Sequence, residues 1–147
     1  MAAPIIAAMH RRWSAVADFA YVYVEEAHAA DEWPLGSVES HPQPKTDAAR
    51  LALAQHFARE YAVPAHEAAA TPPIPVLVDS LDNAFNSAYA VWPERLFVLE
   101  PTEAADGDGR VGGARLAYVA EPKDELGFNR HELHEVLARY VEPAGAA

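Results

Sequence analysis

Cysteine is absent from the 147 residues of this sequence, so the chain has no thiolate nucleophile, no thiolate metal ligand and no disulfide. Basic residues are few: 11 Lys and Arg stand against 22 Asp and Glu, a net charge of −11 with histidine neutral. Phosphate backbones and anionic lipids repel such a chain, which argues against nucleic-acid and membrane partners. No apolar run approaches the roughly 20 residues that a membrane-spanning helix needs. The first residues also lack the order of a signal peptide, so we expect a cytoplasmic protein.

Apolar residues are abundant, at 51 % of the chain, which is enough to build the core of one domain. We therefore expect a single domain over residues 1–142, followed by a frayed tail over residues 143–147. The sequence does not predict the oligomeric state, and a homodimer stays open.

Apolar patterns in the first part of the chain predict helices and strands in alternation. The expected elements are a helix over 2–14 with Trp13 in the core, an interior strand over 18–25, a helix from Asp47 to about Tyr61, and a short buried strand at 76–78. Residues 79–92 are polar and are expected to form a crossover. The proline-rich segment 29–46 predicts a long loop of the kind that often carries function.

The second part of the chain predicts a hairpin and a closing helix. Residues 93–100 and 114–121 flank a turn-rich segment, and residues 133–140 have the spacing of an amphipathic helix. This order predicts an α/β, thioredoxin-like fold, with a mixed sheet flanked by helices. Pro93 precedes the first hairpin strand, where such folds often carry a cis-proline facing the active site, and a trans proline is equally ordinary there.

Polar side chains gather at the end of the predicted strand 18–25. Alternation along a strand places Tyr23 and Glu25 on one face and Glu26 on the other, with His28 just beyond. Ligands of open α/β sheets bind outside the carboxyl ends of the strands, which is where this cluster falls. The alternative interpretation is a solvated strand end with a surface histidine.

The other histidines do not predict a metal site. His41 would face His28 if the proline-rich loop folds back over the sheet edge. Four further histidines are expected on the surface, because they lack partners at ligand spacing or the H-E-x-x-H pattern: His56, His66, His131 and His134.

The stretch "VADFAYVYVEEAHAADEW" at 16–33 resembles the iodothyronine deiodinase signature, in which an apolar strand runs into "YIEEAH" and then "SDGW". Residues 75–100 resemble the family segment that ends in "PERLY", and "GFNRHELHEVLARY" resembles its closing helix. The resemblance covers nearly the whole chain. It implies a thioredoxin-fold selenoenzyme of thyroid hormone metabolism, which reductively dehalogenates an iodothyronine or another halogenated aromatic with an external thiol as reductant.

The resemblance also implies roles for the catalytic residues. His28 would donate a proton or bind a phenolic hydroxyl, and Tyr23 would relay the proton. Glu26 would orient the local structure. His41 and Glu94 would belong to a hydrogen-bond network near the selenolate.

Substrate contacts are implied for three further residues. Trp33 matches the tryptophan of the signature and would anchor its loop from the apolar side, and Arg95 belongs to the "PER" motif. Lys123 loosely replaces a substrate-contacting arginine. A lysine cannot reproduce the planar fork of an arginine, and Glu32 replaces a glycine of the signature, so the true substrate stays open.

The family's selenocysteine falls just ahead of the position equivalent to Met1. We therefore expect a truncated selenoprotein that lacks its N-terminal catalytic strand, and we expect the chain as given to be inactive because it has no selenium or sulfur nucleophile. Two alternatives stay open: a non-catalytic thioredoxin-like binding module, and a thiol or peroxide redox enzyme of the same fold.

Overall fold

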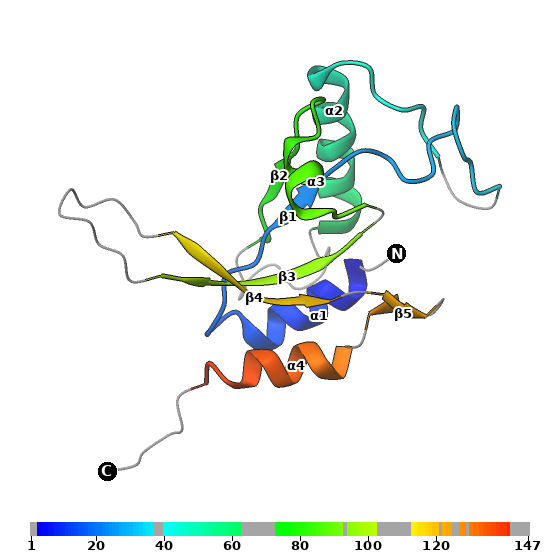
Figure 1. Ribbon diagram of the computed structural model, residues 1–147. Helices are drawn as coiled ribbons and strands as arrows, with labels where there is room; N and C mark the ends of the chain where they lie inside the picture. Colours follow the sequence, from blue (N-terminus) through cyan, green and yellow to red (C-terminus); the bar gives the residue numbers. More distant parts are fainter. Residues whose placement is uncertain are drawn as a thin grey trace, which may run out of the picture. The chain divides into compact units, whose positions relative to one another are not determined.

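The computed structural model describes most of the chain (Figure 1). The described residues are 3–36, 40–62, 73–92, 94–102, 113–120, 122–124, 127–128 and 130–141. They divide into two units, residues 1–93 and 94–147, and each is described by itself. The single domain over 1–142 stays a prediction, and the tail 143–147 lies outside the described residues, as do Pro93 and His66.

The first unit pairs two short parallel strands beside a helix (Figure 1). Its elements are α1 (Ala3–Trp13), β1 (Tyr21–Tyr23), α2 (Asp47–Phe57), the π turn η1 (Ala58–Ala62), β2 (Val76–Val78) and α3 (Ala84–Tyr89). Tyr21 lies opposite Val76 and Tyr23 opposite Val78. Parallel strands need a crossover, which α2 provides by packing against β2. The expected strand 18–25 is thus shorter, and among the described residues its partner is β2.

The helices of this unit follow the predicted apolar spacing. In α1, Ile6, Met9 and Trp13 are buried, which confirms the expected core position of Trp13. Helix α2 begins after Thr46, whose extended backbone lets its Oγ1 accept a hydrogen bond from the Ala49 amide at 3.1 Å.

The polar segment 79–92 contains α3, which the sequence did not predict. The helix has six residues and is bounded by two residues with left-handed backbones, Asn83 with φ 53° and Ala90 with φ 49°. Its first amide groups are bound by a side chain from outside the helix: the carboxylate of Asp79 accepts hydrogen bonds from the Phe85 and Asn86 amides at 3.0 Å each. So short a helix has no apolar periodicity to detect.

The second unit contains the predicted hairpin and closing helix. Its elements are β3 (Leu96–Pro101), β4 (Ala114–Ala120), β5 (Pro122–Asp124), β6 (Gly127–Phe128) and α4 (Arg130–Ala138). β3 and β4 are antiparallel, with Leu96 opposite Ala120, which confirms the hairpin. The small β5–β6 pair was not predicted. Helix α4 buries one stripe of apolar side chains: Leu133, Val136 and Leu137.

These elements confirm the mixed α/β fold class, with one parallel and two antiparallel pairs and helices beside them. Helices in the described part of the chain are all too short or too polar to cross a bilayer.

Candidate functional site

The candidate site lies at the carboxyl end of β1, where the strand geometry stops. The chain bends at Glu25, so the alternation of a strand does not reach the two glutamates. The Tyr23 hydroxyl donates to Oε1 of Glu26. The Glu25 carboxylate instead accepts hydrogen bonds from the side-chain amides of Asn83 and Asn86. The prediction that Tyr23 and Glu25 share a face, opposite Glu26, is therefore wrong.

Gln43 holds the backbone of Glu26 from the loop that precedes α2. The Glu26 amide donates to Gln43 Oε1 at 3.0 Å, and Gln43 Nε2 donates to the Glu26 carbonyl at 3.1 Å. One side-chain amide thus satisfies both backbone groups of Glu26, as a neighbouring strand would. Nothing in the sequence marked Gln43 for this position.

The loop before α2 folds back over the end of β1, as the interpretation of His41 required. The Ala30 amide donates to the His41 carbonyl at 2.8 Å, and Ser40 Oγ donates to the His28 carbonyl at 2.7 Å. The rings contact different partners, however: the His41 ring lies 5.6 Å from that of His56. His56 is half-buried beside it.

His28 contacts Trp33 through both its ring and a ring nitrogen. The ring centroids lie 5.5 Å apart at an edge-on angle, and Nδ1 lies 3.3 Å from the Trp33 carbonyl oxygen. Because a carbonyl only accepts hydrogen bonds, Nδ1 carries the hydrogen in this contact. Nε2 is then the nitrogen through which neutral His28 accepts a hydrogen bond, and through which the cation donates a proton.

The carboxyl group of Glu26 is half-buried, and its surroundings have opposing effects on its pKa. Burial raises its pKa above the ordinary value, while the positive charges of His41 and Arg50 lower it. Burial has the largest effect, so the carboxyl group holds its proton to higher pH than an exposed glutamate does. The Tyr23 hydroxyl, bonded to the same carboxyl group, completes a cluster of groups that can exchange protons.

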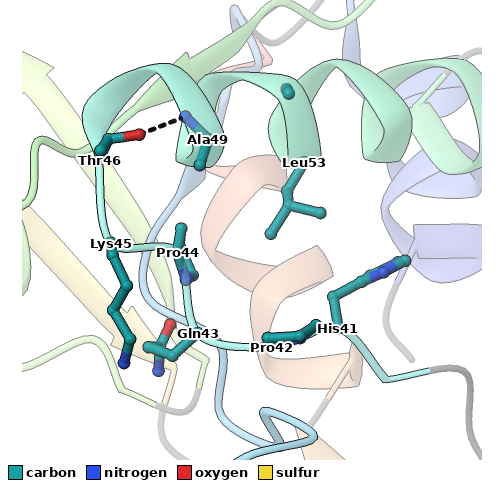
Figure 2. A pocket seen from close by; sticks show the side chains of 9 residues that line it. His41, Pro42, Gln43, Pro44, Lys45, Thr46, Ala49 and Leu53 are labelled. Carbon is teal, nitrogen blue, oxygen red and sulfur yellow. Dashed lines mark hydrogen bonds between the residues drawn. The ribbon is translucent and has the colours of Figure 1, made fainter.

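An open hollow of about 460 Å³ lies between the loop 41–46 and α2 (Figure 2). Its wall is the loop 41–46, and Leu53 points into it from α2. Two of its lining residues also act on Glu26: Gln43 binds its backbone, and the charge of His41 lowers its pKa. Most of the remaining lining is apolar: Pro42, Pro44, Ala49, Ala52 and Leu53.

The first unit contains five of the predicted site residues: Tyr23, Glu26, His28, Trp33 and His41. Trp33 was expected to anchor its loop from the apolar side. Trp33 is 63 % exposed, so it is not buried as an apolar anchor of its loop. Glu94 and Arg95 belong to the second unit, just ahead of β3, with Glu94 exposed and Arg95 half-buried. The side chain of Lys123, in β5, lies outside the described residues.

Besides Gln43, three more residues that sequence reasoning missed shape the site: Arg50, Asn83 and Asn86. Arg50 is 2 % exposed although it stands on an otherwise ordinary amphipathic helix, where an arginine normally faces water. The signal available in the sequence was weak: the polar residues 79–86 follow directly on the strand at 76–78, which the structure leaves partly exposed rather than buried as predicted. Among the described residues, no three histidine or acidic side chains converge as metal ligands would.

A parallel strand pair joined through a helix, with carboxylates and histidines at the carboxyl end of its first strand, places this chain in the thioredoxin-like α/β class. Residues 6–116 match the iodothyronine deiodinase family, and the chain therefore belongs to that family.

Individual deiodinases agree with this assignment. The type I iodothyronine deiodinase of Xenopus laevis is 34 % identical over 88 residues, which is 60 % of this chain and 31 % of that protein. The thyroxine 5-deiodinase of Gallus gallus is 37 % identical over 97 residues, 65 % of this chain and 33 % of that protein. The human type II enzyme is 31 % identical over 109 residues, 69 % of this chain and 36 % of that protein. The chain spans about a third of the length of these curated relatives.

Proposed function

We propose that this chain carries the proton-donating and hydroxyl-binding side chains of a deiodinase-like site, which removes halogen from an iodothyronine or another halogenated aromatic. The observation that supports the proposal is at the end of β1, where the Tyr23 hydroxyl donates to Glu26 in a chain of the deiodinase family. His28 follows Glu26 by two residues along the chain, with its Nδ1 at the Trp33 carbonyl. Dehalogenation of this kind needs a selenol or a thiol, which none of the 147 residues provides. We propose that a segment outside them supplies it, and that an external thiol is the reductant.

The chemistry explains why a histidine is needed. Reductive removal of a halogen leaves an electron pair on the aromatic carbon, which must take up a proton. Imidazole is the side chain that gives up a proton near neutral pH. The contact of His28 Nδ1 with the Trp33 carbonyl fixes the ring, and Nε2 is the position from which His28 donates to carbon or binds a phenolic hydroxyl.

Tyr23, Glu26 and His41 would replace the proton that His28 loses. Burial raises the pKa of Glu26, so this carboxyl group holds a proton closer to neutral pH than a free side chain would. The apolar hollow beside the cluster offers a surface for an aromatic ring.

Ligand binding tests the proposal on the 147-residue chain itself. Thyroxine and 2-iodophenol are titrated separately into the protein, and the ring signals of its histidines are followed by NMR. We expect the His28 signals to move, and His28→Ala to weaken binding about tenfold, the effect of losing one hydrogen bond to a polar group. His134→Ala, a histidine of α4, is the matched control and should bind like the wild type. Equal binding by the His28 and His134 variants would contradict the assignment.

Turnover provides the second test. The chain alone should release no iodide in the presence of a thiol, because it has no selenium or sulfur nucleophile. Genomic DNA ahead of the Met1 codon should contain an in-frame selenocysteine codon within coding sequence. In the enzyme completed from that DNA, His28→Ala should lower turnover roughly 10²-fold or more without loss of folded structure. Turnover close to that of the wild type would remove His28 from the mechanism. The cytoplasmic location and the homodimer stay predictions.

A further inference from the structure

Arg50 of α2 is a cation that the first unit buries almost completely, with 2 % of its surface exposed. Its Nη1 donates to the carbonyl oxygens of Asp79 at 3.2 Å and Ser80 at 2.7 Å, and to Oδ1 of Asn83 at 2.8 Å. Its Nε is buried with no hydrogen-bond partner among the described residues. Desolvating a guanidinium is costly, and apolar residues of similar volume often stabilise a fold equally well. Packing alone therefore does not account for an arginine here.

Asn83 links Arg50 to the end of β1 through hydrogen bonds on both sides of its amide. While Oδ1 of Asn83 accepts from Arg50, its Nδ2 donates to Oε2 of Glu25 at 3.0 Å. Asn86 donates to the other oxygen of Glu25 at 2.7 Å. Both oxygens of this carboxylate are thus held by α3 and its N-terminal residue. The left-handed backbone of Asn83, which asparagine tolerates better than most residues, points its amide between the two partners.

We propose that Arg50, Asn83 and Glu25 form a positioning chain, which fixes the loop after β1 and so sets where Glu26 and His28 stand. The two adjacent glutamates then have different roles: Glu25 anchors the loop through its hydrogen bonds, and Glu26 faces the reacting groups.

The surroundings of Glu26 support this division. Gln43 holds its backbone on one side, and the Glu25 carboxylate is held on the other. The carboxyl group of Glu26 accepts a hydrogen bond from the Tyr23 hydroxyl. His41 and Arg50 face it with positive charge and lower its pKa against the effect of burial. The inference rests on the proposed function only in that Glu26 and His28 are the groups being positioned.

A reciprocal exchange of side chains at positions 25 and 83 tests the positioning chain. Asn83→Asp adds a negative charge and turns the donor to Glu25 into an acceptor, whereas Glu25→Gln removes a negative charge and loses one acceptor oxygen. Combining the two reverses the hydrogen bond between positions 25 and 83 and restores the wild-type net charge. Ser87→Asp, on the exposed face of α3, controls for charge alone. Each variant is made in the full chain and checked for folding by far-UV circular dichroism.

The two single variants change the charge in opposite directions, which separates position from electrostatics. If the chain positions the loop, both should displace the ring signals of Tyr23 and His28 and weaken 2-iodophenol binding about tenfold. The double variant should return to within roughly twofold of the wild type. Arg50→Lys keeps the charge, but its nitrogen lies one bond closer to the main chain than Nη1, so it cannot take the place of Nη1 among the three acceptors, and it should displace the same signals.

Opposite effects of the two single variants, effects matched by Ser87→Asp, or a double variant no better than either single one would overturn the inference. Ring signals of Tyr23 and His28 that stay in place in both single variants would also overturn it, with the proposed function intact. If the wild type binds no 2-iodophenol, the proposed function fails. The NMR ring signals of Tyr23 and His28 then still decide whether the positioning chain fixes the loop after β1.

Discussion

Tyr21 and Tyr23 stand two residues apart on β1 and carry the same hydroxyl group into opposite surroundings. Both rings contact Phe57, at centroid distances of 5.3 and 5.8 Å. The Tyr21 hydroxyl is buried without a hydrogen-bond partner among the described residues, and burial raises the pKa of Tyr21 to about 12. The Tyr23 hydroxyl donates to Glu26. Tyr21→Phe and Tyr23→Phe therefore remove the same atom with opposite expected results.

The expected magnitudes follow from the hydrogen bonds. Burying a hydroxyl without a partner costs about 1 to 3 kcal/mol. We expect Tyr21→Phe to leave the free energy of unfolding unchanged or to raise it by about 1 kcal/mol, because the phenyl ring keeps its packing on Phe57. A hydrogen bond to a charged group contributes about 1.5 to 3 kcal/mol. We expect Tyr23→Phe to lower the free energy of unfolding by about 1 to 2 kcal/mol, since its half-buried site is partly hydrated.

Urea unfolding, followed by tryptophan fluorescence and far-UV circular dichroism, measures both changes, provided that the slopes agree among the variants. Absorbance at alkaline pH provides a separate check, because Tyr21→Phe should remove the phenol that ionises near pH 12. The folded pKa of Tyr21 lies above its unfolded value of 10.0, so its contribution to wild-type stability is complete below pH 10 and is lost as the pH rises toward 12. The Tyr21→Phe protein should lack this loss.

A loss of more than about 1 kcal/mol in Tyr21→Phe would show that its hydroxyl has a partner in solution, and the reasoning would be wrong. A Tyr23→Phe protein as stable as the wild type would show that the bond to Glu26 contributes nothing, which would also weaken the case for the proton-exchanging cluster.

Three other predictions concern the same unit. Burial raises the folded pKa of Glu26, so its contribution to wild-type stability is lost as the pH rises from its ordinary pKa of 4.5 through the folded pKa. Glu26→Gln should therefore gain stability relative to the wild type as the pH rises, and melting curves recorded at a series of pH values would show no such trend if the carboxyl group were hydrated. Asp79→Ala should lower the free energy of unfolding by about 1 to 2 kcal/mol, since the Phe85 and Asn86 amides lose their acceptor; a loss below about 0.5 kcal/mol in urea unfolding would contradict the capping role. Trp33→Ala should change stability by less than about 1 kcal/mol because the ring is 63 % exposed, and a larger loss in the same assay would restore it as an anchor.

The secondary structure followed from the sequence wherever an element carried its own pattern. The aromatic and β-branched strand at 21–23, the apolar stripe of α1 and the turn-rich hairpin are local signals, and the structure has all of them. Helix α3 was missed because it depends on a distant group, the Asp79 carboxylate, and not on its own six residues. Strand alternation failed at Glu25 because the position at which a strand ends depends on tertiary contacts.

The sequence predicted which residues form the candidate site but not the hydrogen bonds that hold them. Family resemblance pointed to Tyr23, Glu26 and His28, and the structure places the first two in direct contact. The supporting residues were invisible because each looks ordinary in sequence: Arg50 on a helix that is otherwise amphipathic, and Gln43 in a polar loop. Their roles come from which backbone groups they reach in space, and a single sequence does not contain that information.

Gln43 also covers backbone groups just beyond the end of β1. By binding both backbone groups of Glu26, it closes the row of hydrogen-bonding groups that would otherwise continue past the end of β1. Open rows of this kind are templates on which a second chain can add a strand, the usual start of aggregation. A single glutamine side chain thus does at this place what other proteins achieve with a charged residue or a covering loop. Loss of Gln43 would show itself first in solubility at high protein concentration, before any change in chemistry at the site.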